Sequence, residues 1–128
     1  MTENEIATKV INCSIKVHKE LGPGLLEKVY EEALCYMLRK EGLKVEKQKE
    51  LPIFFDGVKL ESVYKLDLLV EDKVIIEFKS VESLSDIHLA QTLTYLKLGG
   101  LKLGLLINFN VSLLKNGIKR VINGNLES

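Results

Sequence analysis

The sequence predicts an α/β fold with a mixed central sheet, made of a three-stranded meander plus a crossover strand and flanked by helices. Three observations predict it. Apolar residues recur at helical spacing in residues 3–20 and 25–40, strand-like alternation follows over residues 44–79, and a third helical segment then precedes a short apolar run. A strand reached through a crossover helix runs parallel to its neighbour, whereas hairpin strands are antiparallel. The 128 residues suit a single domain, residues 1–128.

The first two helices are delimited by local signals. Thr2 and Glu5 form a capping-box pattern at the start of a helix over residues 3–20, and Gly22-Pro23-Gly24 ends it. A second helix is expected over residues 25–40, and Glu27 lies at the margin of its apolar stripe. The residues expected in that stripe are Leu26, Val29, Tyr30, Ala33, Leu34 and Met37.

Three strands are expected next. Residues 44–55 and 58–70 alternate in polarity and are joined by Asp56-Gly57, which is a strong signal for a two-residue hairpin turn. Pro52 favours an edge position for the first of these strands, because proline cannot donate a ladder hydrogen bond. Residues 73–79 are apolar enough for a central strand.

A third helix is expected between the Ser83–Asp86 segment, which can cap its start, and the Gly99-Gly100 pair. Residues 103–109 then form a buried strand, parallel to one strand of the meander. The tail, residues 113–122, fits either a short turn plus a strand or a final helix. One line along the third helix carries His88, Gln91 and Tyr95.

Composition excludes several classes of protein. Hydrophobic residues make up 46% of the chain, and eighteen basic residues balance eighteen acidic ones, so no global positive field indicates a nucleic-acid or membrane surface. Cys13 and Cys35 lack the spacing of a zinc site and are expected to be free buried thiols. Neither a leader-like start nor an apolar run of about eighteen residues is present, so we expect a cytoplasmic protein with no membrane partner.

The predicted meander places charged residues inside apolar strands, which requires an explanation. An ionised group buried without a partner costs several kcal/mol, so it is normally paired, exposed or bound to something. Side chains alternate along a strand, so Glu77 and Lys79 share a face. Asp67 joins that face if Val70 pairs with Val74 across a three-residue turn, whereas a two-residue turn places it on the opposite face unless a bulge intervenes.

These residues resemble a known signature. Asp67, then nine residues, then Glu77-x-Lys79 resembles the active-site motif of the PD-(D/E)XK nuclease superfamily. The segment "GPGLLEKVYEEAL", which contains Gly24-x-x-Glu27-x-x-Tyr30, together with "VYKLDLLVEDKVIIEFKS" and "GLLINFNVSLLKNGIKRVIN", looks like the GxxExxY group of that superfamily. The resemblance spans nearly the whole chain and implies a restriction-endonuclease-like core.

The resemblance implies a site. Asp67 and Glu77 would hold a divalent cation, Mg²⁺ or Mn²⁺, Lys79 would assist the attacking water, and Glu27 would add a carboxylate to the metal site. Magnesium prefers hard oxygen ligands and keeps several waters, so two carboxylates suffice. The motif's usual proline is replaced by Leu66, at a position that varies in the superfamily.

Further residues are implied in supporting roles. Gln91-x-x-x-Tyr95 resembles a motif of the RecB-like branch, in which it supports the lysine and contacts substrate phosphate. His18 matches an upstream histidine that some RecB-like enzymes use as a metal ligand, and Tyr30 closes the GxxExxY motif. Each also has an ordinary structural interpretation, because Glu27 suits the first turn of a helix and Tyr30 suits a core aromatic.

Two functional hypotheses follow. The first is a metal-dependent nuclease that hydrolyses phosphodiester bonds, in DNA ahead of RNA. The alternative is a catalytically weak or inactive nuclease-like fold that serves as a nucleic-acid or protein binding module. Glu-x-Lys alone is a weak motif, and the ordered combination with Asp67 and Glu27 favours the first hypothesis. Zero net charge favours a homodimer or an accessory partner protein that supplies additional contacts with the substrate.

Overall fold

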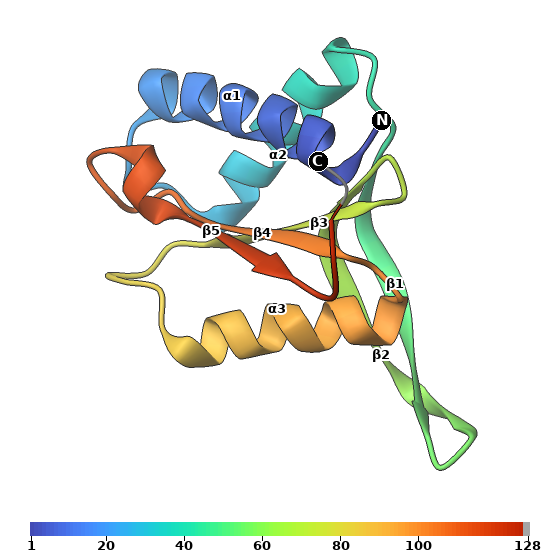
Figure 1. Cartoon of the computed structure of the whole chain (residues 1–128). Coiled ribbons are helices and arrows are strands. Elements are labelled where there is room, and N and C mark those ends of the chain that lie inside the picture. Colours follow the sequence, from blue (N-terminus) through green and yellow to red (C-terminus); the bar gives the residue numbers. More distant parts are fainter. Residues whose placement is uncertain (127–128) are drawn as a thin grey trace.

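The computed structural model describes residues 1–126 and shows an α/β fold with a mixed five-stranded sheet, in the order β1-β2-β3-β4-β5. Helices α1 and α2 cover one face of the sheet and α3 covers the other (Figure 1). The predicted meander, the crossover strand and the helices on both faces are therefore confirmed.

Helix α1 (Glu3–Leu21) begins at the capping box of Thr2 and Glu5, as predicted. Helix α2 (Glu27–Lys40) starts later than expected, and its predicted apolar stripe is partly wrong. Leu26 precedes the helix and is 77% exposed, and Val29 is 39% exposed. Packing against α1 and the sheet selects a neighbouring helical face instead. Its buried residues are Tyr30, Glu31, Leu34, Cys35 and Leu38.

The meander consists of β1 (Val45–Phe55), β2 (Val58–Val70) and β3 (Val74–Lys79), with antiparallel pairing throughout. Strand β1 lies at the edge of the sheet and β3 at its centre, as expected. The turn between β2 and β3 has three residues, because Val70 pairs with Val74. Of the two registers left open by the sequence, the structure therefore has the one that places Asp67 and Glu77 on one face.

Helix α3 (Asp86–Gly99) leads to β4 (Leu103–Asn108), which runs parallel to β3, so this crossover is also confirmed. In the tail, a short 3-10 turn (Leu114–Gly117) precedes β5 (Ile118–Ile122), which pairs with β4. The turn-plus-strand alternative is thus correct.

The two faces of the sheet carry separate apolar clusters. The larger cluster fills the space between α1, α2 and the sheet and includes Val74, Ile76 and Phe78 of β3. The smaller cluster lies under α3 and includes Ile75. Gly104 lets α3 approach β4 closely, because a Cβ at that position would lie 2.8 Å from Cγ2 of Thr92. Because Ile75 lies under α3 and side chains alternate along a strand, β3 presents Ile75, Glu77 and Lys79 toward α3, as predicted.

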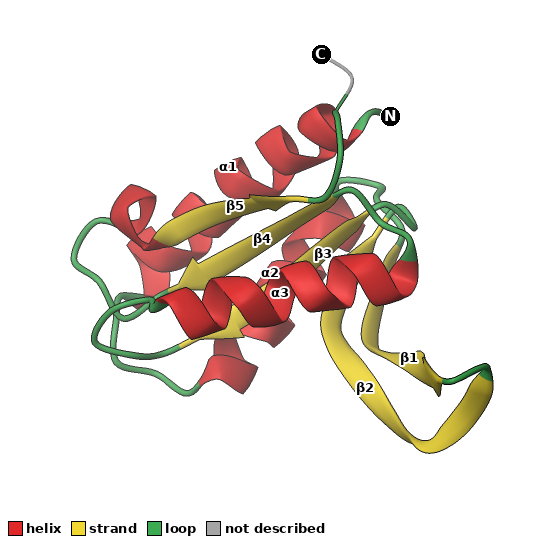
Figure 2. Ribbon diagram, turned by 60° about the horizontal axis from the view of Figure 1, so that its bottom comes forward, coloured by secondary structure: helices red, strands yellow, loops and turns green. Residues whose placement is uncertain are grey.

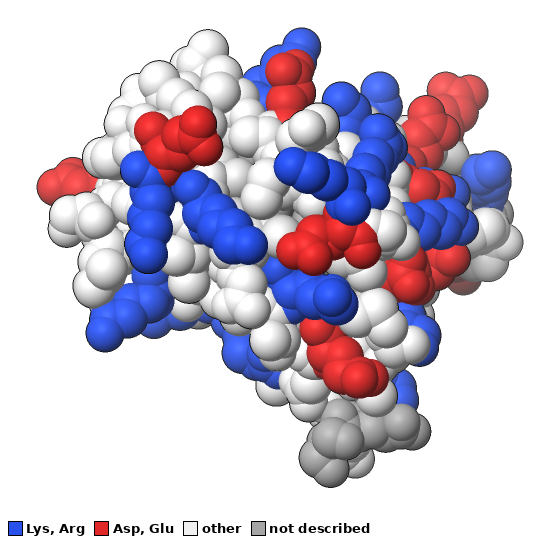
Figure 3. Space-filling model, turned by 90° about the horizontal axis from the view of Figure 1, so that it is seen from above, with Lys and Arg blue, Asp and Glu red and all other residues white. Residues whose placement is uncertain are grey.

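The distal half of the β1–β2 hairpin projects beyond the rest of the molecule (Figure 2). Basic and acidic side chains are interspersed on the face that carries α1 and α2 (Figure 3), in agreement with the balanced composition. Cys13 and Cys35 are free and buried, as expected. Among residues 1–126, no helix is both long and apolar enough to cross a membrane.

Candidate active site

Asp67 and Glu77 occupy neighbouring strands at the point where the β2–β3 ladder ends. The last ladder pair is Leu68 with Ile76, and continuing the same register places Asp67 opposite Glu77. There the Asp67 side chain replaces a backbone partner, because its Oδ2 accepts a hydrogen bond from the Phe78 N–H at 2.9 Å. The carboxylate of Asp67 is thereby held against β3, beside Glu77.

Glu77 is a buried carboxyl group that lacks a hydrogen-bond partner for one oxygen. Its side chain is only 7% exposed, and Oε1 is paired with no group of the described residues. Burial, followed by the neighbouring Asp67 carboxylate, raises the pKa of Glu77 to about 9, while Lys79 acts weakly in the opposite direction. A buried carboxyl group with one oxygen unpaired among the described residues, next to a second carboxylate, is suited to binding a cation.

A hollow of about 230 Å³ between β3 and α3, which we name the α3 hollow, collects most of the predicted site residues. Lys79 is two residues after Glu77 and shares its face, so both side chains border this hollow. Its lining comprises Glu27, Tyr64, Lys65, Asp67, Glu77, Phe78, Lys79, His88, Gln91, Thr92 and Tyr95.

Helix α3 supplies polar side chains from the other wall. Gln91 and Tyr95 line the hollow one turn apart, and Tyr95 packs on Tyr64 with ring centroids 4.7 Å apart. Burial, followed by the neighbouring Tyr64 and Glu77, raises the pKa of Tyr95 to about 12, so its hydroxyl keeps its proton at neutral pH. His88 has a structural task as well, because its Nδ1 accepts the Ser85 N–H at 3.1 Å and so caps α3.

Glu27 connects the first turn of α2 with the end of β3. Its Oε2 accepts a hydrogen bond from the Ser80 N–H at 2.8 Å, directly after Lys79. Asn108 anchors the same connection, because its side chain bonds to both the N–H and the C=O of Val81. The segment after Lys79 is thus tied to α2 and to β4.

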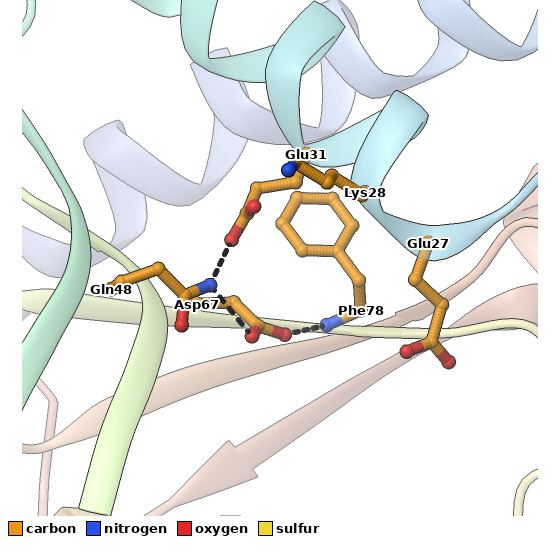
Figure 4. A pocket seen from close by; sticks show the side chains of 6 residues that line it. All are labelled: Glu27, Lys28, Glu31, Gln48, Asp67 and Phe78. Atoms are coloured by element: carbon orange, nitrogen blue, oxygen red, sulfur yellow. Dashed lines mark hydrogen bonds between the residues drawn. The ribbon is translucent and has the colours of Figure 1, made fainter.

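Sequence reasoning missed two polar residues beside Asp67. A second hollow, the α2 hollow of about 350 Å³, is lined by Glu27, Lys28, Glu31, Gln48, Asp67 and Phe78 (Figure 4). The Gln48 amide donates to Glu31 Oε1 at 2.6 Å and reaches Asp67 Oδ1 at 3.5 Å. Burial raises the pKa of Glu31, and the Gln48 amide acts in the opposite direction.

A sequence signal existed for only one of the two missed residues. Glu31 lies one helical turn after Glu27, so the two carboxylates share a side of α2. Gln48 carried no comparable signal, since it adopts a left-handed backbone with φ 51° that its sequence does not announce.

Tyr30 and His18 lie elsewhere. The Tyr30 hydroxyl donates to the Gly22 C=O at 2.6 Å and accepts the Leu25 N–H at 3.1 Å, while its ring stacks on Phe109. His18 Nε2 lies 2.8 Å from the Val111 C=O. Neither residue lines the α2 or the α3 hollow, and both hold the loop between α1 and α2 or the loop after β4.

The donor set of the α3 hollow fits a divalent cation. Asp67 and Glu77 supply hard oxygen ligands, and Glu77 Oε1 is buried without a partner among the described residues. Within residues 1–126, no three His, Cys, Asp or Glu side chains gather into a cluster that could hold a metal ion. Two carboxylates are compatible with Mg²⁺, which is commonly held by one or two carboxylates together with water and substrate oxygens.

Comparison with known proteins gives one match. A family model described as the PD-(D/E)XK nuclease superfamily matches residues 4–121. No curated protein and no solved structure matches the chain. The matched range includes both hollows and every strand up to Val121 of β5.

Proposed function

The chain belongs to the PD-(D/E)XK nuclease superfamily, and from this membership and the site we propose that it is a metal-dependent nuclease that hydrolyses phosphodiester bonds. DNA is the substrate to test first and RNA the second. Within the superfamily, the Gly24-x-x-Glu27-x-x-Tyr30 segment and the Gln91/Tyr95 pair support a GxxExxY protein of the RecB-like branch.

Asp67 and Glu77 would hold the cation, and Glu27 is the candidate for a third carboxylate. A bound Mg²⁺ or Mn²⁺ supplies charge stabilisation at the scissile phosphate and lowers the pKa of a coordinated water. The residues around it act by position. The Phe78 N–H orients the Asp67 carboxylate, and the Ser80 N–H orients that of Glu27.

Lys79 is the candidate for handling the nucleophile. Its side chain borders the α3 hollow on the same face as Glu77, and its Nζ can donate to, or take a proton from, a water that attacks phosphorus. Gln91 and the Tyr95 hydroxyl, which is protonated at neutral pH, can donate to phosphate oxygens from the opposite wall. The hollow thus offers carboxylate ligands for a cation on one side and hydrogen-bond donors for a phosphate on the other.

The observation that carries this proposal is that Glu77 Oε1, beside Asp67, has no hydrogen-bond partner within residues 1–126. A purely structural carboxylate at 7% exposure would be expected to have a donor for each buried oxygen. The cost of burying this group is explained if a cation occupies the hollow in the working protein.

The decisive experiment is a cleavage assay with purified protein on single- and double-stranded DNA and RNA, with Mg²⁺, with Mn²⁺ and with chelator. Wild type should cleave only with metal, and Lys79→Ala should cleave at least about 100-fold more slowly. Lys119→Ala, which changes an exposed lysine on β5, is the matched control and should cleave like wild type. Binding of nucleic acid without cleavage under any of these conditions would support the binding-module alternative.

A further inference from the structure

The projecting part of the β1–β2 hairpin, residues 53–64, carries a concentration of exposed apolar side chains, and we name it the arm. Its apolar residues continue along both strands, and all of the first eight residues of β2 are exposed. The most exposed are the two phenylalanines near the turn. The exposed fractions are 59% for Phe54, 72% for Phe55, 61% for Val58, 37% for Leu60 and 39% for Val63.

The arm receives little support from the body of the protein. It projects past α3 (Figure 2), and Tyr64 at its base packs on Tyr95 of α3. An isolated two-stranded hairpin is only marginally stable in water, and soluble monomers rarely expose a large contiguous apolar patch. These features together indicate a surface that is covered by a partner.

We propose that the arm is a homodimer interface, in which two copies of this chain pack their arms against each other around a two-fold axis. Charge distinguishes this partner from nucleic acid. The arm contains one lysine, Lys59, against two acids, Asp56 and Glu61, so it carries no positive charge that would attract a polyanion. The whole chain has a formal net charge of zero, so two copies do not repel each other over long range.

The arm is also self-complementary. Phe55 pairs with Val58 across the hairpin, and Leu60 lies on the same face because side chains alternate along a strand. In two arms that pack face to face around a two-fold axis, these three side chains of each copy meet the same three of the other. The five exposed side chains present on the order of 400 Å² of apolar surface per copy, divided between the two faces of the arm. A standard interface buries about 800 Å² per partner, so a contact through one face of the arm is small and suits a dimer that forms at high protein concentration.

The test is sedimentation equilibrium of the full chain from low micromolar to submillimolar concentration. We expect twice the mass of one chain at the upper end, and dimerisation weakened about tenfold or more in the Phe54→Ser/Phe55→Ser double variant. The matched control is Tyr36→Ser/Ile87→Ser, because these side chains are 64% and 63% exposed but lie on α2 and α3. The control should dimerise like wild type.

Amide hydrogen exchange locates the interface independently of any variant. Exchange in residues 53–64 should slow as the wild-type concentration rises, while exchange elsewhere stays unchanged. A single-chain mass at every concentration would overturn the proposal, as would a dimer that the double arm variant leaves intact. If wild type is monomeric and only the arm variant loses binding to single-stranded DNA, the arm contacts nucleic acid and the homodimer is refuted.

Discussion

The Asp67 carboxylate accepts the backbone N–H of Phe78 at 2.9 Å, one step beyond the last paired residues of β2 and β3. Beyond the last backbone pair, the Asp67 side chain therefore supplies the acceptor for a β3 backbone N–H. The same carboxylate lies beside Glu77, so the bond that orients Asp67 also holds two acids together. Without a cation, the site contains an electrostatic conflict that the fold itself imposes.

Two substitutions of Asp67 distinguish the effect of its charge on stability from the effect of its hydrogen bond. In chelator at neutral pH, Asp67→Asn should have a free energy of unfolding equal to or above that of wild type. The reason is that residue 67 no longer raises the pKa of Glu77 by its charge, while an Asn oxygen can still accept the Phe78 N–H. Asp67→Ala removes the acceptor as well and should be less stable than Asp67→Asn by about 1 kcal/mol. Urea unfolding of the three proteins measures both differences.

Among wild type, Asp67→Asn and Asp67→Ala, metal should stabilise only the wild type. Ligand binding stabilises the folded state by about 2.7 kcal/mol at a hundredfold excess over Kd, and Asp67→Asn should lose that increment. If Asp67 instead served a structural ion pair, Asp67→Asn would be markedly destabilised in chelator and metal would leave the wild type unchanged.

Glu77 should make the stability of the metal-free protein depend on pH. Its pKa is about 9 in the folded state against an ordinary value of 4.5, so between these values the folded protein holds a proton that the unfolded chain has released. The free energy of unfolding should therefore fall as pH rises from about 4.5 to about 9, by on the order of several kcal/mol.

Glu77→Gln tests this assignment, because glutamine imitates the protonated acid and cannot titrate. Its unfolding free energy in chelator should lack the decline that wild type shows over this pH range. Glu82→Gln, an exposed position after β3, is the control and should keep the wild-type slope. Equal slopes in wild type and Glu77→Gln would show that Glu77 is already ionised in the folded protein.

Most of the fold could be predicted because its signals are local. The bounds of β2 agree with the prediction, since Asp56 and Gly57 adopt the positive φ values, 53° and 74°, that a two-residue hairpin turn requires. The tail stayed ambiguous because the choice between helix and strand depends on the free edge of β4, with which β5 pairs. That partner is remote in sequence and gives no local signal.

The predicted site was incomplete for a related reason. Asp67, Glu77 and Lys79 follow from a motif and from strand alternation, and the α3 hollow contains all three. Glu31 was not predicted as a site residue because its burial depends on the rotation of α2 against the core. Gln48 was not predicted because its approach to Asp67 depends on a left-handed backbone within an edge strand.

Lys79→Ala should lower the cleavage rate by about 10²–10⁴-fold, the range expected for loss of a group that positions or deprotonates the nucleophile. Metal-dependent stabilisation should persist in this variant, because Lys79 is not a ligand. Calcium should support binding of DNA better than cleavage, since its looser coordination shell constrains water and phosphate less. Rate measurements beside Lys119→Ala test the first point, and cleavage that survives in chelator would indicate a contaminating nuclease.

The bond between Glu31 and Gln48 should be measurable as a coupling energy. The Gln48 amide donates to the buried Glu31 Oε1 at 2.6 Å, and it lowers the raised pKa of that carboxyl, so it stabilises the ionised form. In a double-mutant cycle of Glu31→Gln and Gln48→Ala at neutral pH, we expect a coupling of about 1 kcal/mol or more. Pairing Gln48→Ala with Glu32→Gln, an exposed neighbour on α2, should give no coupling.

Acidification provides a second test of this bond. Once Glu31 is protonated, the amide no longer faces a charge, so the coupling should shrink as pH falls through the pKa of that carboxyl. Because the same amide reaches Asp67 Oδ1, Gln48→Ala should also weaken the stabilisation by Mn²⁺, whereas Glu32→Gln should not. A coupling near zero at neutral pH, with Mn²⁺ stabilisation intact in Gln48→Ala, would mean that water replaces the amide and that Gln48 does not position Asp67.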